Sequence, residues 1–162
     1  MPATNEPGST TLATPSDREV VITRVVDAPR RLVFDAWTKP EHVPHWLTGP
    51  EGWTMPVCEI DLRVGGKWRF LLRGPDGAEM QLTGVYKEIT PPSKLVSTSS
   101  WGAPWPDTLD TLTLSEENGK TTITQSILYP SKAARDAALE TGMKEGMAIG
   151  LDRLERYLRT TG

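Results

Sequence analysis

Two short segments on either side of Gly65-Gly66 alternate apolar and charged side chains, and this alternation constrains the fold more than any other feature. The apolar members of the two segments are Cys58, Ile60, Leu62, Val64, Trp68, Phe70 and Leu72. A period of two is typical of strands with one buried face. Gly-Gly supplies the positive φ that a tight hairpin needs. The sequence therefore predicts an antiparallel hairpin whose apolar face points inward.

Further strand-like segments surround this hairpin. Residues 18–28 are rich in Val and Ile, and the segments 79–89, 94–101, 108–116 and 120–129 are separated by turn signals. Between the first strand and the hairpin, residues 29–38 show helical spacing, and residues 40–47 predict a second helix that Pro44 must shorten or kink. Strands grouped apart from helices predict an α+β fold. Its middle is an antiparallel meander of about six strands.

The C-terminal segment predicts a long helix after an N-cap at Ser131. Its apolar stripe consists of Leu139, Met143, Met147, Leu151, Leu154 and Leu158. On the solvent side, the spacing predicts i,i+4 ion pairs of Asp152 with Arg156 and of Glu155 with Arg159.

The same segment holds a row of glycines, Gly142, Gly146 and Gly150. Glycine disfavours a helix interior, so the row needs an explanation. One is a break near Thr141-Gly142. The other is close approach to the sheet, or room left for a ligand. The sequence leaves both open.

Length and charge exclude several classes of protein. The 162 residues fit one domain over 18–162, after a flexible tail rich in Pro, Ser and Thr over 1–17. The net charge of −3 and the lack of a basic block argue against nucleic-acid binding. No apolar run is long enough to span a membrane, and the N-terminus lacks the features of a secretory signal. With a single cysteine, these features predict a cytoplasmic protein.

Several polar groups are candidates for chemical sites. Cys58 is interpreted as a small buried strand residue rather than a nucleophile. His42 and His45 stand three residues apart, but a zinc site would need more ligands than their neighbourhood offers. No metal, cofactor or catalytic residue is therefore assigned.

Glu59, Asp61 and Arg63 share one strand face and form the main charged candidate. Paired carboxylates could act as acid and base, and an arginine could hold an anion. The favoured interpretation is a solvated outer face, because the opposite face of the same strand carries the apolar row.

Tryptophan and methionine supply the candidates for a binding pocket. All the tryptophans lie between residues 37 and 105, several in loops rich in Pro and Gly, and the helix stripe contributes methionines. Such side chains line adaptable apolar pockets. The expected ligand contacts are Trp46, Trp53, Met55, Trp68, Phe70, Met80, Leu82, Trp101, Trp105, Leu112, Met143, Met147 and Leu151.

Four stretches together resemble a known family: VFDAWTKPEHVPHWLTGPEGW, DLRVGGKWRF, GVYKEITPPSKLVST and GMKEGMAIGLDRLERYL. In order and spacing they are similar to the SRPBCC superfamily, also called START-like or birch-pollen-allergen-like. Within it they look like the branch named for the activator of the heat-shock chaperone's ATPase. The resemblance covers roughly residues 18 to 160. It implies a helix-grip fold, with a seven-stranded antiparallel sheet gripping the last helix around an apolar cavity.

The resemblance leaves several functions open. The favoured hypothesis is binding of a small, largely apolar molecule between the sheet and the C-terminal helix. The alternatives are a chaperone-cofactor type of interaction module, associated with stress response, and a cyclase- or hydrolase-like enzyme acting on aromatic or polyketide-like compounds. A homodimer is compatible with each of them. Many members of the branch carry tryptophan at the position that resembles Met147 of this chain, which implies a softer pocket of different shape.

Overall fold

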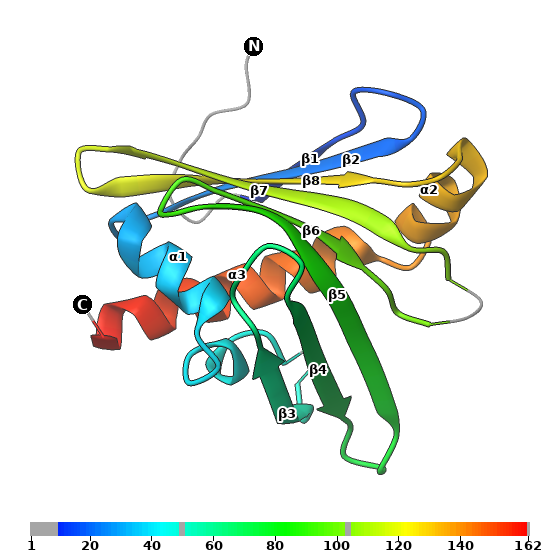
Figure 1. Ribbon diagram of the computed structural model, residues 1–162, viewed down its shortest axis with the longest axis horizontal. Helices are drawn as coiled ribbons and strands as arrows, with labels where there is room; N and C mark the ends of the chain where they lie inside the picture. Colours follow the sequence, from blue (N-terminus) through cyan, green and yellow to red (C-terminus); the bar gives the residue numbers. More distant parts are fainter. Residues whose placement is uncertain (1–9, 49–50, 103–104, 162) are drawn as a thin grey trace.

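The computed structural model describes residues 10–48, 51–102 and 105–161, and within them one antiparallel sheet is wrapped along a long helix (Figure 1). The sheet has eight strands in the order β1-β2-β8-β7-β6-β5-β4-β3. The strands are β1 Thr10–Ala13, β2 Glu19–Val26, β3 Thr54–Ile60, β4 Lys67–Arg73, β5 Glu79–Thr90, β6 Lys94–Ser99, β7 Thr108–Glu117 and β8 Lys120–Leu128. The predicted α+β class and the six-stranded meander from β3 to β8 are confirmed.

The helical elements fall into two groups along the chain. After β2 come α1, Arg30–Thr38, and a single 3-10 turn η1, Val43–His45. After β8 come α2, Lys132–Leu139, and the long helix α3, Met143–Thr161. Figure 1 shows α3 running along the sheet from the α2 end to α1 and η1. No helix in the described part of the chain is long and apolar enough to cross a membrane.

Two elements differ from the sequence prediction. The sheet has eight strands rather than seven, because Thr10–Ala13, expected in the flexible tail, pairs with β2 as β1. Four residues are too few to show a strand period, so the sequence carried little signal for β1; residues 1–9 of the tail lie outside the described part. The second helix expected over 40–47 is only the 3-10 turn η1, with Pro44 near its start.

The turn around Gly65-Gly66 is longer than expected, because it spans residues 61–66 between β3 and β4. β3 ends at Ile60, and the backbone amide of Asp61 donates to the carbonyl of Lys67, which closes the turn. Leu62 and Val64 therefore leave the strand and are exposed, so the prediction that they continue the inward row is wrong. Gly66 is required here, since a Cβ on it would lie 2.1 Å from the Asp61 carbonyl oxygen.

The sequence left two explanations open for the glycine row of the last helix, and the structure bears on each of them. Gly142 adopts φ +77° between α2 and α3, so the predicted break is confirmed there, and Ser131 caps α2 as predicted, accepting a bond from the Ala134 amide. Gly146 lies inside α3, and a Cβ placed on it would meet nothing within 4 Å. Close approach to the sheet therefore does not explain Gly146.

A buried ion pair fixes the second half of α3 to β2. The Arg24 side chain is only 2% exposed, and its Nη2 lies 2.9 Å from Oε1 of Glu155. Its Nη1 lies 2.8 Å from Oδ1 of Asp152 and donates to Thr10 Oγ1 at 2.9 Å, which ties β1 to the same group. The other Glu155 oxygen accepts a bond from the Asp27 amide at 3.2 Å. One arginine thus holds the helix, β2 and the edge strand together.

This ion pair corrects the charge pairs predicted for α3. The predicted pair of Glu155 with Arg159 is present at 3.9 Å, but Glu155 is 6% exposed rather than solvated. Asp152 is exposed as expected but pairs with Arg24 instead of Arg156. Helical spacing identifies neighbours on one helix, whereas Arg24 lies far away in the sequence.

We predict that Glu155→Gln lowers the free energy of unfolding by about 3 kcal/mol, because it leaves the buried Arg24 without its closest counter-charge. Arg159→Ala is the matched control on the same helix, and its cost should stay below about 0.5 kcal/mol because its contact with Glu155 is long and the Arg159 side chain is exposed. Urea denaturation of both variants measures the two values. Equal, small losses would contradict the anchoring role of Arg24.

A candidate binding site under the first half of the C-terminal helix

One face of the sheet looks toward α3, and strand register identifies its residues. Arg24 reaches α3 from β2 and is paired with Ile123 of β8, which in turn is paired with Leu114 of β7. Because side chains alternate along each strand, Leu112 and Asp110 of β7 lie on this same inner face. The inner face continues into β6, since Leu112 is paired with Leu95 and Asp110 with Ser97.

Burial along this inner face is uneven. Side chains around the anchored end of α3 are completely covered: Ile22, Val26, Ile123 and Leu154 are 0% exposed. Those farther across the sheet keep a small exposure: Leu112 5%, Trp68 6%, Phe70 7%, Leu95 7% and Ser97 9%. The first half of α3 contributes Met143 and Met147, both half-buried, and Ile149, which is exposed. The apolar stripe of α3 is thus less buried at Met143 and Met147 than at Leu151, Leu154 and Leu158.

Aromatic side chains form one wall of this less covered region. The rings of Trp68 and Phe70 lie 4.8 Å apart on β4, and Leu82 of β5 is opposite Phe70. Gly84 of β5 is opposite Trp68, where a Cβ would come within 2.3 Å of the indole. The Trp68 ring therefore lies directly on the backbone of β5, which fixes its orientation.

Asp110 is the most unusual group on the inner face. Ser99 Oγ donates to its Oδ2 at 2.6 Å, and Thr108 Oγ1 donates to its Oδ1 at 2.7 Å. Burial raises the pKa of the Asp110 carboxyl, and the two hydroxyl bonds only partly oppose this. Within the described residues, no Lys or Arg forms an ion pair with it.

Tyr129 connects Asp110 to the helix. Burial, together with the negative charge of Asp110, raises the pKa of Tyr129 to about 12. The Tyr129 hydroxyl donates to Met143 Sδ at 3.8 Å, at the first residue of α3. A carboxyl group, hydroxyls and a thioether thus meet at the end of the sheet where α3 begins.

The residues predicted from sequence are distributed unevenly. Trp68, Phe70, Leu82, Leu112, Met143 and Met147 lie on the inner face or on the facing helix stripe, with Met55 and Leu151 buried in the same core. Trp46 is a core anchor that donates from Nε1 to the Ala36 carbonyl oxygen. Trp53 lies against Gly74, where a Cβ would be 2.9 Å from the indole ring. Met80, Trp101 and Trp105 are exposed.

Sequence reasoning missed the polar part of this region, namely Asp110, Ser97, Ser99 and Tyr129. A signal was present, because Asp110 falls in phase with Leu112 and Leu114 along β7. A carboxylate in an apolar row is informative, since buried acids are rare without a partner. The serines gave no such signal because short hydroxyl side chains are common on both faces of strands.

The charged set Glu59, Asp61 and Arg63 does not join this region. Arg63 is 70% exposed on its side chain and bonds Asp61 within the turn at 2.8 Å. Glu59 pairs with Arg69 on the exposed face of β4 at 3.1 Å. This placement agrees with the favoured interpretation of a solvated set. Burial raises the pKa of the Cys58 thiol to about 11, which keeps it protonated and argues against a nucleophile.

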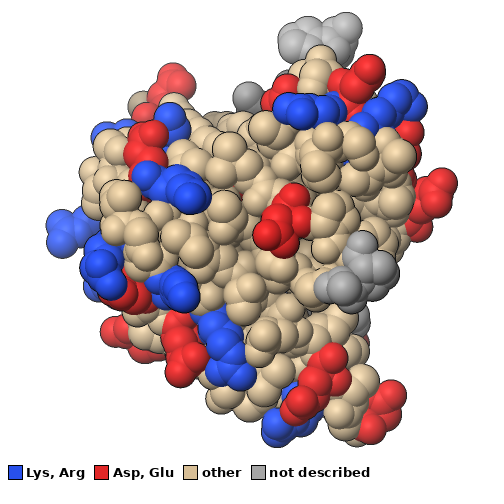
Figure 2. Space-filling view, turned by 45° about the vertical axis from the view of Figure 1, so that its right-hand side comes forward, with Lys and Arg blue, Asp and Glu red and all other residues tan. Residues whose placement is uncertain are grey.

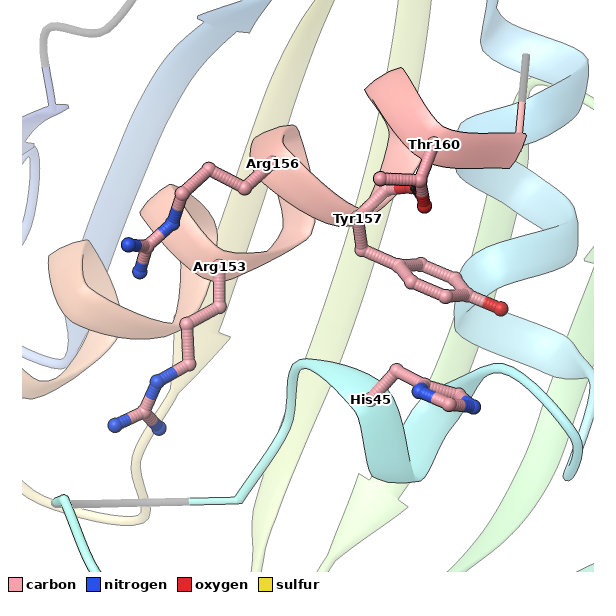
Figure 3. A pocket seen from close by; sticks show the side chains of 5 residues that line it. All are labelled: His45, Arg153, Arg156, Tyr157 and Thr160. Atoms are coloured by element: carbon pink, nitrogen blue, oxygen red, sulfur yellow. Dashed lines mark hydrogen bonds between the residues drawn. The ribbon is translucent and has the colours of Figure 1, made fainter.

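A separate depression lies on the outer side of the second half of α3 (Figure 3). It measures about 330 Å³ and is lined by His45, Arg153, Arg156, Tyr157 and Thr160. His45 stacks on Tyr157 with ring centroids 4.7 Å apart, and Figure 3 shows the two arginine side chains extending away from this ring pair. No group of His, Cys, Asp and Glu suited to a metal ion occurs among the described residues.

The comparisons with known proteins now identify the family. The sequence profile of the Activator of Hsp90 ATPase homolog 1-like proteins matches residues 27–159. The chain belongs to this family. It is thereby a member of the SRPBCC superfamily, as the resemblance implied.

Solved structures agree with this assignment. A Rhodobacter sphaeroides protein is 27% identical with a TM-score of 0.89, over 93% of this chain and 98% of that one. A Rhizobium leguminosarum protein is 28% identical with a TM-score of 0.67, over 94% and 97%. An AHSA1-like protein from Aeromonas hydrophila is 21% identical with a TM-score of 0.66, over 88% and 94%, and shows the fold alone. None of the curated proteins compared with this chain matches it.

We predict that Asp110→Asn raises the melting temperature at neutral pH by about 2 to 4 °C, or roughly 1 kcal/mol in a chain of this size. The folded pKa of Asp110 lies above its unfolded value, so the ionised group costs stability at neutral pH. That cost disappears as the pH falls through the folded pKa. The advantage of the variant should therefore shrink toward zero below about pH 4.

Calorimetric melting of both proteins across this pH range tests the prediction. A variant that is less stable than the wild type at neutral pH would show that the carboxylate is compensated within the fold.

Proposed function

We propose that this protein binds a small, largely apolar molecule between the inner face of the sheet and the first half of α3. The observation that supports this is unequal burial along the apolar stripe of α3: Leu151, Leu154 and Leu158 are buried, whereas Met143 and Met147 pack against the same core but are only half-buried. Ligand sites are typically apolar, with a few convergent polar groups. This region has that composition, with Asp110 and its hydroxyl partners at one end.

Each part of the region has a distinct role in this proposal. Trp68 and Phe70 supply a rigid apolar wall, because the packing of the Trp68 ring against the Gly84 backbone limits its movement. Met143 and Met147 supply the opposite wall, and unbranched thioether side chains adjust to ligands of different shape. Figure 2 shows the side of the molecule that lies to the right in Figure 1. Apart from an acidic patch near its middle, Lys, Arg, Asp and Glu lie mainly toward the rim of this face. Such a face suits the approach of an uncharged ligand body.

A second candidate is an interaction module for a partner protein, such as the chaperone that the family name mentions. Trp101, Trp105 and Ile149 favour it, because each is a large apolar side chain that remains exposed. A chaperone partner would cover them on binding. The enzyme alternative has less support, since Glu59, Asp61 and Arg63 are exposed and paired with neighbouring charges.

The test uses the fluorescence of Nile red, an uncharged apolar dye, with two variants of one helix. Met147→Trp fills the space at a residue that packs against the core, and it should weaken dye binding by about tenfold or more, since an occupied pocket excludes the ligand. Ile149→Trp adds similar bulk at an exposed position and should leave binding unchanged.

The two variants also separate the candidate functions. Equal loss in both variants, or no dye binding by the wild type, would contradict a pocket under α3. Retention of a purified chaperone by the wild type, lost in Trp101→Ala and Trp105→Ala, would favour the interaction module instead.

A further inference from the structure

We propose that the ligand carries a protonated amine and that Asp110 binds this amine. The inference rests on the proposed function, because it names the chemistry of the polar end of the same site. Asp110 is a half-buried acid, and its hydrogen-bond partners among the described residues are the hydroxyl groups of Ser99 and Thr108.

Each fully buried charge in the described part of the chain has an opposite charge as its partner. Arg24 has two carboxylates within ion-pair distance, and Glu155 has Arg24. The buried Arg135 pairs with Asp136 at 2.9 Å. Burial of a charge is costly unless an opposite charge accompanies it. Asp110 lacks that opposite charge, and the open end of the inner face is where a ligand would bring it.

The contacts of Asp110 favour a cation over a neutral donor. Each carboxylate oxygen already accepts one hydrogen bond from a hydroxyl group, that of Ser99 or Thr108. A neutral donor on the ligand would add another bond of the same kind but no positive charge. A protonated amine adds the missing positive charge, and charge-assisted bonds are roughly twice as strong as neutral ones. Tyr129 is a third hydroxyl group that interacts electrostatically with this carboxyl, since the charge of Asp110 contributes to the raised pKa of Tyr129.

The loop beside Asp110 fits the same ligand. The segment that joins Ser99 to Thr108 carries Trp101 and Trp105, both exposed. Tryptophan faces attract ammonium groups through the cation–π interaction. Aromatic side chains on this loop therefore suit an approaching amine, whereas they give no advantage to a carboxylic acid.

Three naphthalene compounds with the same ring and different ends test the inference: naphthylmethylamine, naphthylmethanol and naphthylacetic acid. Each is titrated against protein carrying Nile red, and its displacement of the dye is measured. We expect the amine to bind about tenfold tighter than the alcohol, and the acid to bind weakest. In Asp110→Asn the amine should lose this advantage while the alcohol binds as before.

Glu59→Gln is the matched control, since it removes one carboxylate from the exposed face of β3. It should keep the full preference for the amine, which excludes a general effect of net charge. A loss of preference in Glu59→Gln equal to that in Asp110→Asn would overturn the inference.

A second measurement needs only the wild-type protein. The Asp110 carboxyl is titrated by NMR with and without each compound. Bound amine should lower the pKa of Asp110, because a nearby cation favours the ionised form, and bound alcohol should leave it nearly unchanged. An unchanged pKa with bound amine would overturn the inference even if Asp110→Asn proved unable to bind any compound.

The outcomes keep this inference and the proposed function apart. If Nile red binds and the amine binds no more tightly than the alcohol, the proposed pocket is supported and the proposed role of Asp110 is contradicted. If neither the dye nor any naphthalene binds, the proposed function itself fails.

Discussion

The ion pair between Arg24 and Glu155 is the contact on which the arrangement of this protein depends. It lies where α3 crosses β2, is nearly inaccessible to water, and also engages Asp152 and Thr10. Removing one partner of such a pair leaves an uncompensated buried charge, so the helix is held firmly at this end. The opposite end of α3 has no comparable anchor among the described residues. It begins after the left-handed Gly142, and the weak bond from the Tyr129 hydroxyl to Met143 joins it to the end of the sheet.

A helix held at one end gives the sheet two different environments. Under the anchored half, apolar side chains are completely buried and form an ordinary core. Under the first half, the inner face keeps some exposure and includes Asp110, a carboxyl group whose burial raises its pKa. Proteins commonly depart from the rules of stable packing where they have a function. The loose half of α3 and the uncompensated acid lie at the same end of the sheet, which is why one ligand can explain both.

The sequence predicted the overall architecture because it depends on local patterns. Alternation around Trp68 and Phe70 located the hairpin, and the apolar stripe of α3 located the helix. Local patterns could not reveal β1, which is four residues long and stable only through its pairing with β2. They also extended β3 to Val64, because alternation continues through the turn that Gly66 permits.

The site was harder to predict than the fold, because it depends on contacts between distant residues. Glu155 resembled one half of an exposed helix pair until its contact with Arg24 of β2 was known. Asp110 resembled an ordinary strand residue, although its phase with Leu112 indicated an inward acid. The apolar walls could be predicted from strand phase and helix stripe, whereas the exposure of Trp101 and Trp105 could not, since a loop has no period.

Native mass spectrometry of the protein purified from its own cells tests the central claim most directly. The account predicts protein ions heavier than the bare chain by one small molecule, which denaturing extraction should release for identification. Bare protein that also stays bare after incubation with an extract of those cells would contradict a ligand site under α3.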